Sequence, residues 1–208
     1  MITLNNVNKK FGDTEILKNI NINLEKNKIY GFEGKNGSGK TVLFKMICGF
    51  IAPSSGKILI NNKEIGKDID FPEKCGILIE SPGFIDRFSA YKNLKLLADI
   101  NRTISDSEIK KWMDFYDLEF NSKKKVKNFS LGMKQKLGLI QAFMEEPNIL
   151  ILDEPMNALD EKSVIKTREL LNSLKNNTII LISSHNKEDI ESLCDEIFLI
   201  DNGIITKK

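Results

Sequence analysis

The fold class is indicated most strongly by one segment, Gly34-Lys35-Asn36-Gly37-Ser38-Gly39-Lys40-Thr41. It fits the pattern G-x-x-x-x-G-K-[ST] and lies between a strand-like run, 28–33, and an apolar helical run, 42–48. Its glycines let backbone N–H groups turn inward around a polyphosphate, and the N-terminus of the following helix favours the same anion. We expect Lys40 to reach the β- and γ-phosphates and the Thr41 hydroxyl to bind Mg²⁺. A glycine-rich turn without a ligand is the alternative, which the strand–loop–helix context disfavours.

Outward from this loop, strand and helix patterns alternate along the chain. Ser105 and Glu108 form a capping-box pattern at the start of one of the helices in the middle of the chain. The order predicts a single α/β domain over residues 1–208, a P-loop NTPase (RecA-like) fold whose mostly parallel sheet has an antiparallel β edge and an inserted helical subdomain. The predicted strands are 20–24, 28–33, 57–60, 63–65, 149–152, 178–183, 196–200 and 204–206, and the predicted helices are 42–48, two within 89–117, 131–144, 161–174 and 187–194.

Composition excludes several functional classes. The 208 residues carry 31 Lys and Arg against 29 Asp and Glu, a formal net charge of +2, so we expect no nucleic-acid partner. The longest apolar runs have the length of strands, well below the roughly 18 residues of a membrane span. The N-terminus has no basic region followed by an apolar one, so no secretory signal is expected. Three widely spaced cysteines form no zinc or disulfide pattern, which fits a reducing, cytosolic setting.

A second group of polar residues follows two apolar strands. Asp153 and Glu154 directly follow the apolar run 149–152. His185, the only histidine, follows the run 178–184. In a parallel sheet, ligands collect at the carboxyl ends of the strands, so these side chains should face the phosphate loop. Asp153 then fits a Mg²⁺ ligand, and Glu154 fits a base that deprotonates an attacking water. Alone, the acids would be a solvated strand end and the histidine a surface residue; the phosphate loop favours the functional interpretation.

The segment Phe129-Ser130-Leu131-Gly132-Met133-Lys134-Gln135 resembles the signature LSGGQ of ABC transporter ATP-binding subunits, and the similarity to that family covers essentially the whole chain. Ser130 and Gly132 match the signature, whereas Leu131 replaces a glycine and Met133 stands where many members have glutamine. The serine hydroxyl at a helix N-terminus still makes an anion site.

Three smaller segments support the same resemblance. Asn157-Ala158-Leu159-Asp160 is similar to the D-loop, and Phe11 is placed like the aromatic residue that stacks on adenine, although on residue type alone it would more often be a core residue. Ile77-Leu78-Ile79-Glu80-Ser81-Pro82 occupies the position of the Q-loop, with Glu80 in place of the usual glutamine. A carboxylate adds negative charge to an anionic site, so the glutamine's coupling role does not transfer directly. Glu80 and the signature together resemble the bacitracin- and lantibiotic-resistance branch.

The resemblance implies a mechanism in which two copies meet head to tail. ATP would lie between Lys40 and Thr41 of one copy and Ser130 and Gly132 of the other, with adenine against Phe11. The implied roles are catalysis for Lys40, Glu154 and His185, ATP binding for Gly34, Lys35, Asn36, Gly37, Ser38 and Gly39, Mg²⁺ binding for Thr41, Asp153 and Glu80, and communication between the two sites for Asn157 and Asp160.

The same resemblance implies a division of the chain and a membrane partner. Residues 1–83 and 145–208 would form the catalytic core, and 84–144 the helical subdomain. The groove near Glu80 would receive a separate transmembrane permease and hold the chain, otherwise cytoplasmic, at the inner face of the cell membrane. ATP hydrolysis would power export of a peptide antibiotic or a similar amphiphile. Two alternatives remain open here: an ABC-type ATPase acting on DNA or ribosomes, and a nucleotide-gated module with little turnover.

Overall fold

A mostly parallel sheet carries the phosphate loop near its centre. The computed structural model describes residues 1–80 and 83–208, and within them six strands follow the order β10-β9-β3-β8-β7-β6. All neighbours are parallel except β10, which runs antiparallel to β9 at one edge as predicted. The strands are β3 (Lys28–Glu33), β6 (Cys75–Leu78), β7 (Ile149–Asp153), β8 (Ile179–Ser183), β9 (Glu196–Asp201) and β10 (Ile204–Lys207).

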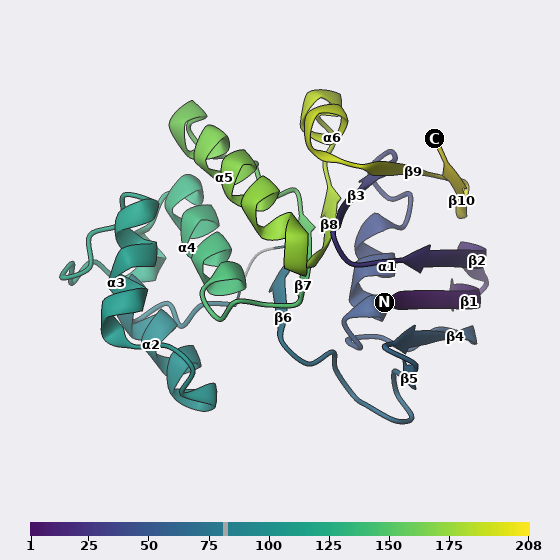
Figure 1. Cartoon of the computed structure of the whole chain (residues 1–208), viewed down its shortest axis with the longest axis horizontal. Helices are drawn as coiled ribbons and strands as arrows, with labels where there is room; N and C mark the ends of the chain where they lie inside the picture. The colour runs from purple at the N-terminus through teal and green to yellow at the C-terminus, as the bar shows by residue number, and fades with distance from the viewer. Residues whose placement is uncertain (81–82) are drawn as a thin grey trace.

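The central strands are apolar on both faces because each face packs against a different layer. On β7, Leu150 and Leu152 join the core beneath the helices of the middle and end of the chain, whereas Ile149 and Ile151 point to the other side. This second core also contains helix α1 (Lys40–Ile47), which lies between the parallel sheet and a second, antiparallel sheet (Figure 1). Burial on both faces explains the continuous apolar runs of these strands.

The second sheet is antiparallel and has the order β2-β1-β4-β5. The sequence pattern predicts no strand at residues 2–11, which form the long strand β1 of this sheet. The pairing of β1 with β2 shifts register between Leu4 and Val7, so both side chains are buried although they are three residues apart. This shift breaks the alternation of buried and exposed residues by which a strand is recognised in a sequence. The strands are β1 (Ile2–Phe11), β2 (Thr14–Leu24), β4 (Ser55–Ile60) and β5 (Lys63–Glu64).

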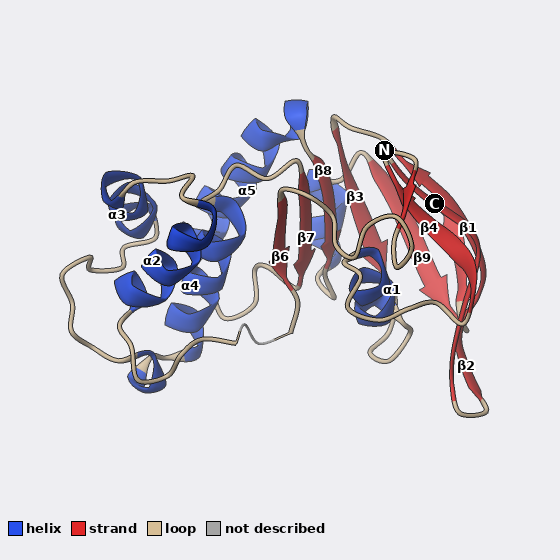
Figure 2. Ribbon diagram, turned by 90° about the horizontal axis from the view of Figure 1, so that it is seen from below, coloured by secondary structure: helices blue, strands red, loops and turns tan. Residues whose placement is uncertain are grey.

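The remaining helices lie on the other side of the parallel sheet or beyond its end. Three of them, inserted between β6 and β7, gather at one end of the molecule, opposite the antiparallel sheet (Figures 1 and 2). The predicted capping box of Ser105 and Glu108 is present at the start of α3. The helices are α2 (Ala90–Asn101), α3 (Asp106–Phe115), α4 (Leu131–Phe143), α5 (Glu161–Leu174) and α6 (Lys187–Leu193), with short 3₁₀ turns at Val126–Asn128 and Lys175–Asn177.

The predicted α/β fold, with a mostly parallel sheet and an antiparallel edge, is confirmed. Among residues 1–80 and 83–208, we find no helix that combines the length and the apolar character needed to cross a membrane.

Candidate functional site

The phosphate-loop segment connects β3 to α1 and is shaped by its glycines. At Gly34, a side chain would place its Cβ 2.5 Å from the Ser38 hydroxyl oxygen and 2.6 Å from the Ile200 carbonyl oxygen, so only glycine fits there. Gly39 precedes α1 with a φ of +108°, and it offers no side-chain cap to the first N–H groups of that helix. These uncapped N–H groups make the loop a ready anion site.

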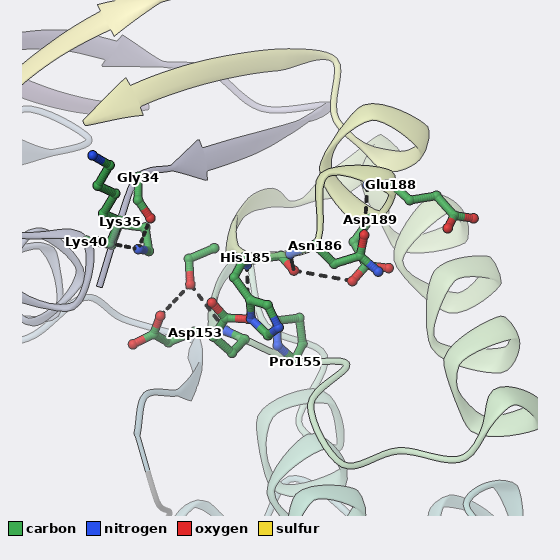
Figure 3. Close-up of polar contacts among 12 residues, drawn as sticks. Gly34, Lys35, Lys40, Asp153, Pro155, His185, Asn186, Glu188 and Asp189 are labelled. Carbon is green, nitrogen blue, oxygen red and sulfur yellow. Dashed lines mark hydrogen bonds and ion pairs between the residues drawn. The ribbon is translucent and has the colours of Figure 1, made fainter. Parts of the chain in front are cut away.

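The backbone of the phosphate loop holds the Lys40 side chain at the mouth of the loop. Its ammonium donates to the carbonyl oxygens of Gly34, at 2.6 Å, and Lys35, at 3.2 Å (Figure 3). The Ser38 hydroxyl is buried and has no hydrogen-bond partner in the described part of the chain. A buried donor without a partner is costly, and a phosphate oxygen would satisfy it.

Asp153 ends β7 directly beside the start of α1. The Thr41 hydroxyl donates to its Oδ2 at 2.6 Å, and the Ser183 hydroxyl donates to its Oδ1. Ser183 ends the neighbouring strand β8 and pairs in register with Asp153. The structure therefore brings together the hydroxyl and the carboxylate predicted as Mg²⁺ ligands.

Glu154 and His185 meet across the same strand ends. The Glu154 Oε2 lies 2.8 Å from His185 Nδ1 and also accepts the His185 backbone N–H at 3.3 Å. Glu154 has a φ of +52°, and its own N–H donates to the Ser183 carbonyl oxygen at 3.1 Å. A carboxylate held by an imidazole at a strand end can take a proton from a bound water.

Two hollows flank the phosphate loop and join these groups into one site. One, of about 410 Å³, contains Phe11 with its ring half exposed and the Lys9 ammonium 4.8 Å from the ring centre. The other, of about 490 Å³, contains His185. The first is lined by Phe11, Ile16, Asn36, Gly37, Gly39, Lys40, Thr41, Val42, Asp153 and Glu154, and the second by Glu33, Gly34, Lys35, Asn36, Ser184, His185, Lys187 and Leu199.

Comparison with known proteins identifies the family. A model of the ABC transporter family matches residues 17–157, more than half of the chain. The chain belongs to the ABC transporter family. It is 44% identical to the uncharacterized ABC transporter ATP-binding protein YybJ of Bacillus subtilis (strain 168), over 98% of this chain and 94% of that protein.

Other relatives place this ABC ATPase in the expected branch. It is 36% identical both to the bacitracin transport ATP-binding protein BcrA of Enterococcus faecalis and to the lantibiotic transport ATP-binding protein SrtF of Streptococcus pyogenes. The matches cover all of this chain, with 68% of BcrA and 90% of SrtF. A solved ATP-binding subunit of an ABC transporter superposes with a TM-score of 0.89 at 25% identity, covering all of this chain and 89% of that one. The chain is thus an ATP-binding transporter subunit and an ATPase.

The signature segment of this ABC ATPase lies outside its own phosphate-loop hollows. Ser130 caps α4 by accepting the Met133 N–H at 3.3 Å, and Leu131 is 69% exposed. Gly132 is required by packing, because a Cβ there would lie 2.6 Å from the Ala158 carbonyl oxygen. Neither Ser130 nor Gly132 is among the residues that line the two hollows.

Glu80 is not brought into contact with Thr41 or Asp153. Its carboxylate forms an ion pair with Lys45 of α1 at 2.7 Å, and the residue has a φ of +55°. It is absent from the lining of either hollow. The other residues of the predicted I-E-S-P context, Ser81 and Pro82, lie outside the described residues.

The D-loop segment of the ABC ATPase connects β7 to α5. The Asn157 N–H donates to the Glu154 carbonyl oxygen at 3.2 Å. Asp160 caps α5 by accepting the Ser163 N–H at 2.9 Å, and it pairs with Lys136 of α4 at 2.7 Å. The hydrogen bond from the Lys136 ammonium, together with the bond from Ser163, lowers the pKa of Asp160 below its ordinary value.

Gln135 is a site residue to which sequence analysis assigned no role. Its side-chain N–H₂ group donates to the carbonyl oxygens of Glu154 and Pro155, each at 3.0 Å. Gln135 lies on the signature helix α4, so it ties this helix to the backbone that carries Glu154. Gln135 is part of the signature segment, so the family resemblance points to it. Its contact with Glu154 spans nineteen positions of the sequence, and no local pattern predicts a contact at that distance.

Proposed function

We propose that this ABC ATPase drives export of a peptide antibiotic or a similar amphiphile by closing head to tail with a second copy around ATP. The observation that carries the closure is the division of the site, whereas the cargo class is supported by the similarity to bacitracin and lantibiotic transport proteins. One surface holds Lys40, Thr41, Asp153, Glu154 and His185 together, whereas the signature serine lies at a separate helix N-terminus. A second copy would complete the site with Ser130 and Gly132, so ATP would be part of the interface.

Each residue of the phosphate-loop surface takes one role in this proposal. Lys40 and the backbone of residues 34–39 bind the phosphates, and Phe11 stacks on the adenine. Glu154 removes the proton of the attacking water, and His185, bonded to its carboxylate, contacts the γ-phosphate. Asn157 and Asp160 carry the state of one site to the other, because they connect to Glu154 and to the signature helix, respectively.

Mg²⁺ fits the oxygen ligands that the structure brings together. Thr41 and Asp153 supply a hydroxyl and a carboxylate 2.6 Å apart, and Mg²⁺ is commonly held by one or two such groups together with water and substrate phosphates. Within residues 1–80 and 83–208, no three His, Cys, Asp or Glu side chains gather as a metal site, which fits an ion held mainly by nucleotide and water. When bound, the ion would neutralise charge on the phosphates.

A groove beside the inserted helices would receive the permease. It has a volume of about 370 Å³ and includes Phe50, Ile79 and Ile100, and the Ile100 side chain is 75% exposed. A concave surface that combines exposed apolar side chains with the polar groups of Asn101, Gln141 and Glu145 fits an amphipathic helix of a membrane partner. In this arrangement the permease contacts both the helical subdomain, residues 84–144, and the catalytic core of 1–83 and 145–208. The chain would then be cytoplasmic and peripheral on the inner face of the membrane.

The test is the mass of the Glu154→Gln protein in solution. This variant should bind ATP and lose turnover by on the order of 10²–10⁴, the range for removal of a general base. It should be a dimer with Mg-ATP and a monomer with Mg-ADP. Adding Ser130→Ala should abolish the dimer without abolishing ATP binding. A Glu154→Gln protein that binds ATP but stays a monomer would contradict closure by the isolated chain.

Near wild-type hydrolysis in Glu154→Gln would mean that another residue is the general base, with Glu80 the first candidate.

A further inference from the structure

The ion pair between Lys45 and Glu80 lies next to the proposed metal ligands. Lys45 follows Thr41 by four residues on α1, and side chains at this spacing are neighbours on one face of a helix. On the sheet side, Leu78 pairs in register with Leu152, so the chain reaches Glu80 just beyond the strand end that holds Asp153. The pair at 2.7 Å therefore lies beside the contact of Thr41 with Asp153.

The exposure of this pair argues against a main role in folding stability. The side chains of Lys45 and Glu80 are 30% and 60% exposed, and ion pairs in such settings contribute little to stability. The effect on local charge is larger, because the phosphates of a nucleotide would bring several negative charges to the same edge when no metal is present. An unpaired carboxylate here would repel the nucleotide, whereas an ion pair is electrically close to the neutral glutamine of other family members.

We propose that Lys45 is a positioning residue that neutralises Glu80 and thereby lets an acidic Q-loop coexist with a triphosphate. The lysine acts through Glu80 and does not touch the nucleotide. This inference rests on the proposed nucleotide site, and it adds a residue to which neither the motif pattern nor the relatives' names assign a role. This chain departs from the family pattern at Glu80, and the positive charge of Lys45 would compensate the negative charge that this departure adds.

The experiment is a double-mutant cycle read out by binding of a fluorescent ATP analogue to the monomer, in EDTA and in excess Mg²⁺. Lys45→Met removes the cation and unmasks Glu80, so metal-free affinity should fall about three- to tenfold at low salt. Glu80→Gln leaves Lys45 unpaired, so metal-free affinity should rise by a similar factor. The double variant should return to within about twofold of the wild type, because both charges are gone.

Controls separate this role from a structural one. Lys45→Arg keeps the charge and should bind like the wild type. Lys63→Met with Glu73→Gln removes an exposed ion pair by the amino end of β7 and should leave affinity unchanged. Excess Mg²⁺, which screens the phosphates, and 0.5 M salt should both shrink the differences.

The proposal is overturned if the two single variants shift metal-free affinity in the same direction or if the double variant binds as weakly as Lys45→Met alone. It is also overturned if Lys45→Met changes the urea midpoint but not the affinity, which would assign the lysine to the last turn of α1 alone. Because binding is measured on the monomer, failure of the ATP-dependent dimer would contradict the closure mechanism without altering these expectations.

Discussion

At the scale of single residues, Glu154 is held in a rare backbone conformation, with a φ of +52°. A positive φ is rare outside glycine and is kept only when surrounding bonds enforce it. At Glu154 these bonds are the backbone contact with Ser183 and the side-chain contact with His185. The conformation aims the carboxylate at the strand edge beside the phosphate loop, so local strain and the proposed catalytic role coincide.

Phe11 allows a prediction at the same scale. Its half-exposed ring lines the nucleotide hollow, and loss of an aromatic stacking partner costs about 0.5–1.5 kcal/mol. Phe11→Leu should therefore weaken ATP binding about two- to tenfold and leave tripolyphosphate binding unchanged, as measured by titration calorimetry. Phe50→Leu, which changes an exposed ring in the other groove, is the matched control. Equal loss for ATP and tripolyphosphate would contradict stacking on adenine.

Between elements, Gln135 links the signature helix to the strand end that carries Glu154. Gln135→Met keeps the length and the helix propensity but removes both hydrogen bonds to the carbonyl oxygens of Glu154 and Pro155. We expect turnover to fall up to about thirtyfold with ATP affinity retained, since two neutral hydrogen bonds contribute about 1 kcal/mol each and about 1.4 kcal/mol is tenfold in rate.

Steady-state hydrolysis and equilibrium binding measure the two effects. Gln141→Met is the control, because Gln141 lies on the same helix but lines the permease groove. Unchanged turnover in Gln135→Met would mean that the backbone at Glu154 keeps its conformation without the glutamine.

The contact of β6 with α4 depends on one glycine. A Cβ at Gly76 would lie 1.9 Å from the Ala142 carbonyl oxygen, which is rigid backbone. Gly76→Ala should therefore lower the free energy of unfolding by about 1–3 kcal/mol, the cost of forcing extra atoms into a packed core. Urea denaturation measures it, with Gly83→Ala as the control because, chain neighbours apart, no atom of the described residues lies within 4 Å of a Cβ there. A midpoint equal to that of Gly83→Ala would show that the helix can shift away freely.

For the molecule as a whole, the groove proposed for the permease shares no lining residue with the two hollows beside the phosphate loop. Ile100→Lys should leave ATP hydrolysis by the isolated chain unchanged and abolish its sedimentation with membranes that contain the permease. Ile165→Lys is the matched control, because Ile165 is an exposed isoleucine on α5 outside the groove. Full membrane association of the Ile100→Lys protein would move the docking surface elsewhere.

Local patterns were sufficient for most elements and for the outline of the site. The phosphate loop, the capped helix at Ser105 and the strand ends at Asp153 and His185 each depend on neighbouring residues, so a short window of sequence contains the information. The family resemblance, now confirmed, added the signature and the D-loop. Strands β1 and β6 were missed: the register shift of β1 breaks the periodicity that a short window detects, and β6 has only four residues, too few to show a period.

Tertiary structure alone decided which of these groups touch. Thr41 meets Asp153 across 112 residues, Glu154 meets His185 across 31, and Lys45 meets Glu80 across 35. Strand order and register set these contacts, and the sequence pattern of each strand is compatible with several neighbours. Residue types therefore identified the chemistry, but the parallel order of β3, β8, β7 and β6 brought its parts to one edge.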